Sequence, residues 1–127
     1  MTAADRPEDA VEQYRLAESL VSERRPLEAL RELAPVLDVE PDAKSVQLLA
    51  GRAYLQSAQL HRAEEAFLRV LEQDPSDHYA RFVLGRTLLR QSRLEEARAQ
   101  LAMAAAMHPT PGYQEALNEV RMRLALG

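Results

Sequence analysis

The sequence has no cysteine, no tryptophan and no long hydrophobic run. Without cysteine the chain cannot form disulfides, thiolate nucleophiles or cysteine-ligated zinc and iron–sulfur centres. The longest apolar run, residues 101–107, is far too short to cross a bilayer. The acidic first residues also lack the charged-then-apolar order of a secretory signal. We therefore expect a cytoplasmic protein that does not associate with membranes.

Signatures of catalysis are scarce as well. The chain has no glycine-rich phosphate loop, no nucleophile elbow and no zinc-ligand spacing, so we expect no enzyme activity, no cofactor and no metal. The net charge of −4 opposes extensive wrapping of nucleic acid. Of the sixteen basic residues only Lys44 is a lysine, and arginine is the residue that holds carboxylates with two hydrogen bonds.

Helical periodicity is present almost throughout. Four glycines and seven prolines leave long segments uninterrupted. Within them apolar residues recur three or four positions apart, as Leu16 with Leu20 and Leu84 with Leu88. This spacing places apolar side chains on one face of a helix, and strand-like alternation is missing. The 127 residues, 46% of them hydrophobic, are predicted to form one all-α domain.

An internal repeat organises the helices. Pro41, Pro75 and Pro109 lie 34 residues apart. The same period relates four further sets: Ala29, Ala63 and Ala97; Ala17, Gly51 and Gly85; Leu33, Phe67 and Leu101; Leu20, Tyr54 and Leu88. Matching the two "EEA" strings would give a period of 31, but that shift breaks every other set. The sequence therefore contains three copies of a 34-residue unit.

These repeated positions resemble the tetratricopeptide repeat, whose pattern is W-x2-L-G-x2-Y, then A-x3-F, then P. Residues 10–111 follow the pattern in phase, although Gln13, Gln47 and Arg81 occupy the tryptophan position. The resemblance implies an all-α solenoid, an α-α superhelix of three helix-turn-helix repeats closed by a C-terminal cap helix. The expected division is a leader at 1–8 and a single domain at 9–127, with repeats at about 10–43, 44–77 and 78–111 and a cap at 112–125. The expected helices are 9–23, 26–39, 44–57, 60–73, 78–91, 94–107 and one near 112–125.

Two packing features follow from the repeat. Gly51 is expected to face Ala63 where the two helices of a repeat come closest, because a larger side chain there would force them apart. Pro35 falls inside the helix 26–39, where it removes a backbone hydrogen bond and should bend the helix.

His61 lies one helical turn before Glu64 and Glu65, a spacing that could hold a metal or pair an acid with a base. Its counterparts in the other repeats are Leu27 and Glu95, and a column that accepts such different residues is typical of a solvent-facing position. We therefore expect an exposed polar face, with Glu65 helping Arg69 four residues on. The histidines at 78 and 108 also lie near repeat junctions, and nothing in the sequence brings the three together.

The resemblance implies a concave ligand-binding surface lined by the first helix of each repeat. Its candidate residues share a position on that face: Tyr14, Glu18, Leu48, Arg52, Gln56, Tyr79, Phe82, Arg86, Arg90 and Tyr113. Four of the six aromatic residues fall there, and tyrosine and arginine often carry interface energy. The alternative is that some of these side chains, such as Leu48, only pack against the neighbouring repeat.

Some members of the family hold the acidic tail of heat-shock chaperones with a clamp of Lys, Asn and Arg. The matching positions here are Tyr14, Glu18, Leu49, Tyr79 and Val83, which do not fit. Glu18 would repel such a tail, so chaperone-tail recognition is not expected.

The sequence thus predicts a non-catalytic adaptor that binds a partner peptide or helix in its concave groove, the partner carrying acidic and apolar side chains. A structural self-association module, in which copies of the chain form a homo-oligomer, is the alternative. A small anion or nucleic-acid binder is a third possibility that the net charge opposes; no nucleic-acid partner is expected.

Overall fold

The computed structural model describes residues 7–127, and the described part contains helices but no strands. The seven helices are α1 (Pro7–Ser22), α2 (Pro26–Val39), α3 (Lys44–Gln56), α4 (Leu60–Gln73), α5 (His78–Arg90), α6 (Leu94–Met107) and α7 (Pro111–Leu126). Each expected helix is found within two residues of its predicted bounds. Most of the predicted leader lies outside the described residues, and α1 begins at Pro7.

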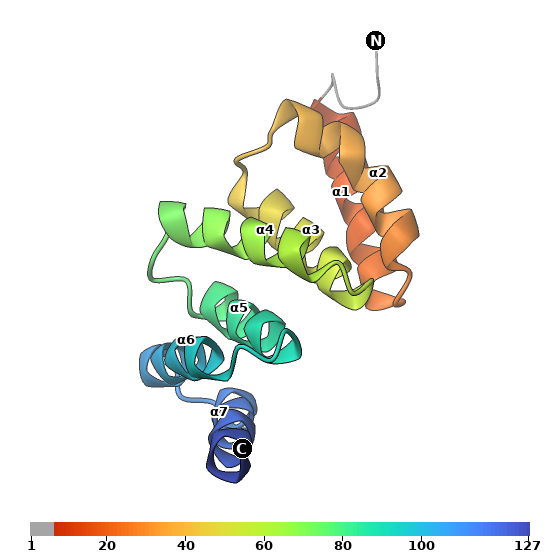
Figure 1. Ribbon diagram of the computed structural model, residues 1–127. Coiled ribbons are helices and arrows are strands. Elements are labelled where there is room, and N and C mark those ends of the chain that lie inside the picture. The colour runs from red at the N-terminus through yellow and green to blue at the C-terminus, as the bar shows by residue number, and fades with distance from the viewer. Residues whose placement is uncertain (1–6) are drawn as a thin grey trace.

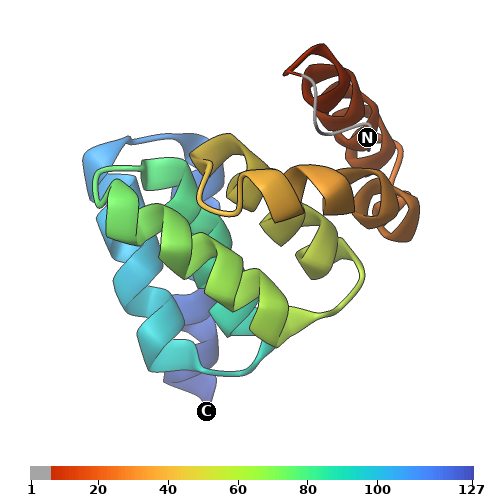
Figure 2. The ribbon, with the colours of Figure 1, turned by 90° about the horizontal axis from the view of Figure 1, so that it is seen from above.

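The helices stack as successive antiparallel pairs from the N-terminal to the C-terminal end (Figure 1). Each helix contacts its neighbours in sequence, and α1, α3, α5 and α7 also contact one another in that order. The same order is visible from above, where α1 and α2 project to one side of the remaining helices (Figure 2). The predicted all-α solenoid is therefore confirmed. No helix in the described part is both long enough and apolar enough to cross a membrane.

The turn inside each helix pair has one conformation, repeated three times. Arg24, Ala58 and Ser92 have positive φ values of 59°, 61° and 59°, and these positions are again 34 residues apart. The next backbone N–H bonds the carbonyl five residues earlier, as from Gln59 to Tyr54 at 2.8 Å. Glycine is the usual residue at such a left-handed position after a helix, and the conformation costs any other residue about 1–2 kcal/mol.

The second helix of each pair ends two residues before a proline, as the sequence predicts. The residue after α4, Asp74, donates its backbone N–H to the Val70 carbonyl, and Pro75 then prevents a further helical residue. The next helix begins at a side-chain cap in two cases: Asp77 accepts from the Ala80 N–H at 2.8 Å, and Thr110 accepts from the Tyr113 N–H at 3.3 Å. α2 continues through Pro35, where the expected bend remains a prediction.

The Phe67 ring fills the space beside Gly51, a contact that the sequence analysis did not predict. A Cβ atom placed at Gly51 would lie 2.3 Å from Cε1 of Phe67, and the expected contact between Gly51 and Ala63 remains a prediction. Gly85 repeats the arrangement, because a Cβ atom there would lie 2.6 Å from Cγ of Leu101 and 3.5 Å from the carbonyl oxygen of Ala97, the counterpart of Ala63. The larger side chain one turn after the alanine therefore fills the gap between the helices.

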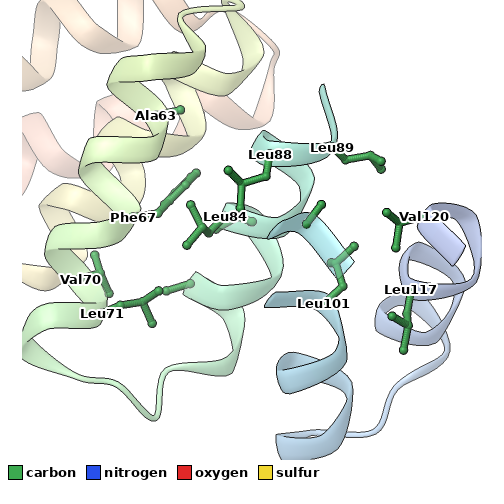
Figure 3. Close-up of a cluster of buried hydrophobic side chains, with 13 residues drawn as sticks. Ala63, Phe67, Val70, Leu71, Leu84, Leu88, Leu89, Leu101, Leu117 and Val120 are labelled. Atoms are coloured by element: carbon green, nitrogen blue, oxygen red, sulfur yellow. The ribbon is translucent and has the colours of Figure 1, made fainter. Parts of the chain in front are cut away.

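The core consists of two clusters. One joins α1, α2 and α3 around Leu33 and Leu49, and the other extends from α4 to α7 around Phe67, Leu84 and Leu101 (Figure 3). Tyr54 is the described hydrophobic residue that packs against both clusters. The first helix pair is therefore attached to the rest of the solenoid through α3.

Candidate functional site

A groove crosses α3, α5 and α7, all of which are first helices of their pairs. One hollow of about 310 Å³ is lined by Arg24, Arg52, Leu55, Gln56, Tyr79, Phe82, Val83, Arg86 and Arg90. A second of about 290 Å³ is lined by Phe82, Arg86, Leu89, Arg90, Gly112, Glu115, Ala116, Glu119 and Arg123. The two share Phe82, Arg86 and Arg90, so they adjoin. We call them together the central groove.

The first hollow of the central groove is strongly positive. Arg24, Arg52, Arg86 and Arg90 line it, and no acidic residue does. Within residues 9–127, whose side chains are described, none of these four guanidinium groups forms an ion pair with a carboxylate. Unpaired guanidinium groups offer several donors in a fixed plane and can bind carboxylates with two hydrogen bonds each. The second hollow adds Glu115 and Glu119, so the charge changes along the groove.

Aromatic rings form the floor between these arginines. The guanidinium of Arg86 lies 5.7 Å from the centroid of the Phe82 ring, within the range of a cation–π interaction. Tyr79 lies on one side of Phe82 at 6.4 Å, and Tyr113 stacks on it with ring centroids 4.5 Å apart. Tyr113 itself is buried, so it supports Phe82 from below. Burial raises the pKa of the Tyr113 hydroxyl, with smaller contributions from Tyr79 and Asp77.

Two of the candidate polar residues also hold the helices together. Gln56 donates from Nε2 to the Val21 carbonyl at 3.0 Å and thereby ties the end of α3 to the end of α1. Arg90 donates from Nη1 to the Leu55 carbonyl at 2.7 Å and ties α5 to α3. These bonds join the helices beside the first hollow.

The candidates from the first repeat lie apart from the central groove. Tyr14 and Glu18 line a separate hollow at the N-terminal end, beside Arg15 and Glu40. Burial raises the pKa of the Tyr14 hydroxyl; the negative charge of Glu18 adds to the increase, and the positive charge of Arg52 opposes it. Leu48, from the second repeat, does not line the central groove either; it is partly buried and packs against the larger core cluster.

The structure brings together two histidines that the sequence analysis left separate. His78 begins α5 and His108 follows α6, and their rings are stacked with centroids 4.1 Å apart and planes 12° from parallel. Nδ1 of His78 lies 2.9 Å from the hydroxyl oxygen of Tyr113. The repeat contains a signal that could have found them. Lys44 and Asp74 occupy the same positions one repeat earlier and carry opposite charges, and they form an ion pair at 2.8 Å.

His61 is exposed, as expected, and the part of the chain with described side chains holds no cluster of three potential metal ligands. The expectation for Glu64 is wrong. Its side chain is largely buried and pairs with Arg93 at 2.7 Å, linking α4 to the turn before α6. The expected ion pair between Glu65 and Arg69 is not found among the described side chains either. Arg93 is 29 positions from Glu64, and local spacing cannot show such a pairing.

The stacked helix pairs with their repeated turn define an α-solenoid, a class in which each unit contacts only its neighbours. A model of the tetratricopeptide repeat matches residues 14–57 and 48–112. The chain belongs to the tetratricopeptide repeat family, whose members serve as protein-interaction modules. None of the curated proteins is similar enough in sequence to match this chain.

Solved structures agree in fold at low sequence identity. The first tetratricopeptide domain of Spaghetti (RPAP3) bound to the HSP90 peptide SRMEEVD is 17% identical, covers 91% of this chain and 93% of its own, and has a TM-score of 0.84. The Sgt2 domain from Aspergillus fumigatus is 15% identical, covers 98% and 83%, and also has a TM-score of 0.84. The Yersinia enterocolitica chaperone SycD with a peptide of the translocator YopD is 16% identical, covers 93% and 96%, and has a TM-score of 0.79.

Proposed function

We propose that this protein is a non-catalytic adaptor whose central groove binds an extended peptide or helix of a partner protein with acidic and apolar side chains. The observation that carries the proposal is the set of four arginines around the Phe82 ring, Arg24, Arg52, Arg86 and Arg90, none of which forms an ion pair among residues 9–127. Carboxylates of the partner would bind the guanidinium groups, and apolar side chains would pack on Phe82 and Tyr79.

Structural relatives support a peptide as the kind of ligand. The RPAP3 domain holds an HSP90 peptide, and SycD holds a peptide of YopD. The clamp positions argue for a different sequence from a chaperone tail. Two of them, Leu49 and Val83, are buried in the core, and Glu18 would repel an acidic tail.

Tyr14, Glu18 and Leu48 would contribute less than the residues of α5. Tyr14 and Glu18 line the N-terminal hollow, so they would contact the partner only where it extends beyond Arg52. Gln56 and Arg90 would hold the groove open, and Tyr113 would support Phe82.

The test is capture of partners from lysate of the native host, with the double variant Arg52→Glu/Arg86→Glu beside the parent protein. A matched control is Arg31→Glu/Arg121→Glu, which changes the net charge equally at exposed positions outside the groove. The proposal expects the groove variant to lose the partner and the control to keep it. Equal capture by both variants would show that the partner binds elsewhere.

A further inference from the structure

Four aromatic side chains connect the junction between α6 and α7 to the central groove. His108 stacks on His78, the Nδ1 atom of His78 lies 2.9 Å from the Tyr113 hydroxyl, and Tyr113 stacks on Phe82 at 4.5 Å. Phe82 in turn lies under Arg86 and lines both hollows of the groove. A displacement of the histidine pair would therefore reach Phe82 through direct contacts.

The previous junction offers an internal comparison. Lys44 and Asp74 occupy the same repeat positions as His78 and His108, and they form an ion pair at 2.8 Å. The hydrogen bond from Lys44 lowers the pKa of Asp74 to about 2, and the bond with Asp74 raises the pKa of Lys44. Both groups stay charged between pH 5 and 8, so this junction is insensitive to pH in that range.

The histidine junction differs because imidazole is the side chain that changes its charge between pH 5 and 8. Stacked neutral rings attract, whereas two imidazolium rings with centroids 4.1 Å apart repel. The titratable groups beside the pair include Tyr113, which contacts both rings, and Asp77 and Tyr79, which flank His78 in the sequence. Lys44, which pairs with Asp74, also binds Asp77. Asp77 precedes His78 in the sequence, but its carboxylate already binds Lys44 and caps α5.

We propose that the His78–His108 pair makes the C-terminal half of the central groove responsive to pH. The groove keeps its shape while no more than one ring is charged. Protonation of both rings separates them, frees Tyr113 and repositions Phe82, and the start of α7 loosens. The inference rests on the proposed function for its biological meaning, but the test does not involve the partner.

The experiment is an NMR titration of the intact protein from pH 8 to pH 5, following the Hε1 protons of the two histidines and the ring protons of Phe82. Amide hydrogen exchange of residues 111–126 is measured at both ends and corrected for intrinsic exchange. The variant His78→Lys/His108→Asp copies the charged pair of the previous junction, and His108→Gln removes one ring without adding charge.

In the parent protein we expect the Phe82 shifts to change with the same midpoint as the histidines. Exchange in α7 should rise at least about fivefold at pH 5. This factor corresponds to the free energy with which two unit charges 4.1 Å apart repel each other in a medium as polar as water. Both variants should show less than about a twofold rise. The inference would be overturned if the chemical shifts of Phe82 did not change with the histidine titration, or if either variant kept the pH response of the parent protein. Such a result would not affect the outcome of the partner-capture test.

Discussion

Gly51 gives the sharpest test of the packing between the two helices of a repeat. Its replacement by alanine would place a Cβ atom 2.3 Å from Cε1 and 2.8 Å from Cδ1 of the fully buried Phe67 ring. Alanine gains about 1 kcal/mol over glycine in a helix interior, but overpacking in a core costs about 1–3 kcal/mol. The net effect of Gly51→Ala on the free energy of unfolding should therefore be a loss of up to about 2 kcal/mol.

The first repeat shows how the clash can be relieved, because Ala17 and Leu33 occupy the positions of Gly51 and Phe67. Phe67→Leu alone should cost about 1–1.5 kcal/mol through lost packing. Combined with Gly51→Ala it recreates the pair of the first repeat, so the double variant should be more stable than the sum of the two single changes predicts, by about 1–3 kcal/mol.

The assay is urea unfolding followed by far-ultraviolet circular dichroism, with all four proteins of the cycle measured together. Gly112→Ala is the control, since no atom lies within 4 Å of the added Cβ, and it should raise stability by up to about 1 kcal/mol. A Gly51→Ala protein stabilised like the control, with effects in the cycle that add within about 0.5 kcal/mol, would refute the reasoning.

Three further predictions concern the turns, the junction and the core. Ala58→Gly should raise stability by about 1 kcal/mol because the residue has a φ of 61°, whereas Ala99→Gly inside α6 should lower it by about 1 kcal/mol; thermal melts compare the two. Because its pKa is lowered to about 2, Asp74 stabilises the fold above pH 4 and loses this effect as the pH falls toward 2. Asp74→Asn should therefore be less stable than the parent at pH 7, and the difference should shrink in acid melts. Ala63→Leu introduces a large side chain at a position with no exposed surface and should cost about 1–3 kcal/mol in urea unfolding.

The sequence predicts the helices well because the repeat determines them three times over. The prolines at 41, 75 and 109 end the second helices, and the apolar columns place the first helices between them. Side chains that pair across helices are predicted less well. Glu64 pairs with Arg93, and Phe67 lies beside Gly51. Neither contact was predicted, because such contacts depend on side-chain length and on the crossing of two helices.

The groove shows the same limit. The repeat places Arg52, Arg86 and Phe82 on one face, and the structure brings them together with Arg24, which the sequence analysis did not include. Arg24 follows α1 in a left-handed turn, so helical periodicity says nothing about its direction. The histidine pair was missed for another reason. The positions 44 with 74 and 78 with 108 follow the repeat, but their residue types differ, and a search for similar residues passes over them.

The central claim is that a partner binds in the groove formed by the first helices of the repeats. The most direct measurement is an NMR footprint of the purified partner, once captured, on the isotope-labelled protein. The account predicts that the largest shift changes and the strongest line broadening fall on Arg52, Phe82 and Arg86 and on their neighbours in α3 and α5. Changes confined to α2, α4 and α6, with these three residues unaffected, would contradict it.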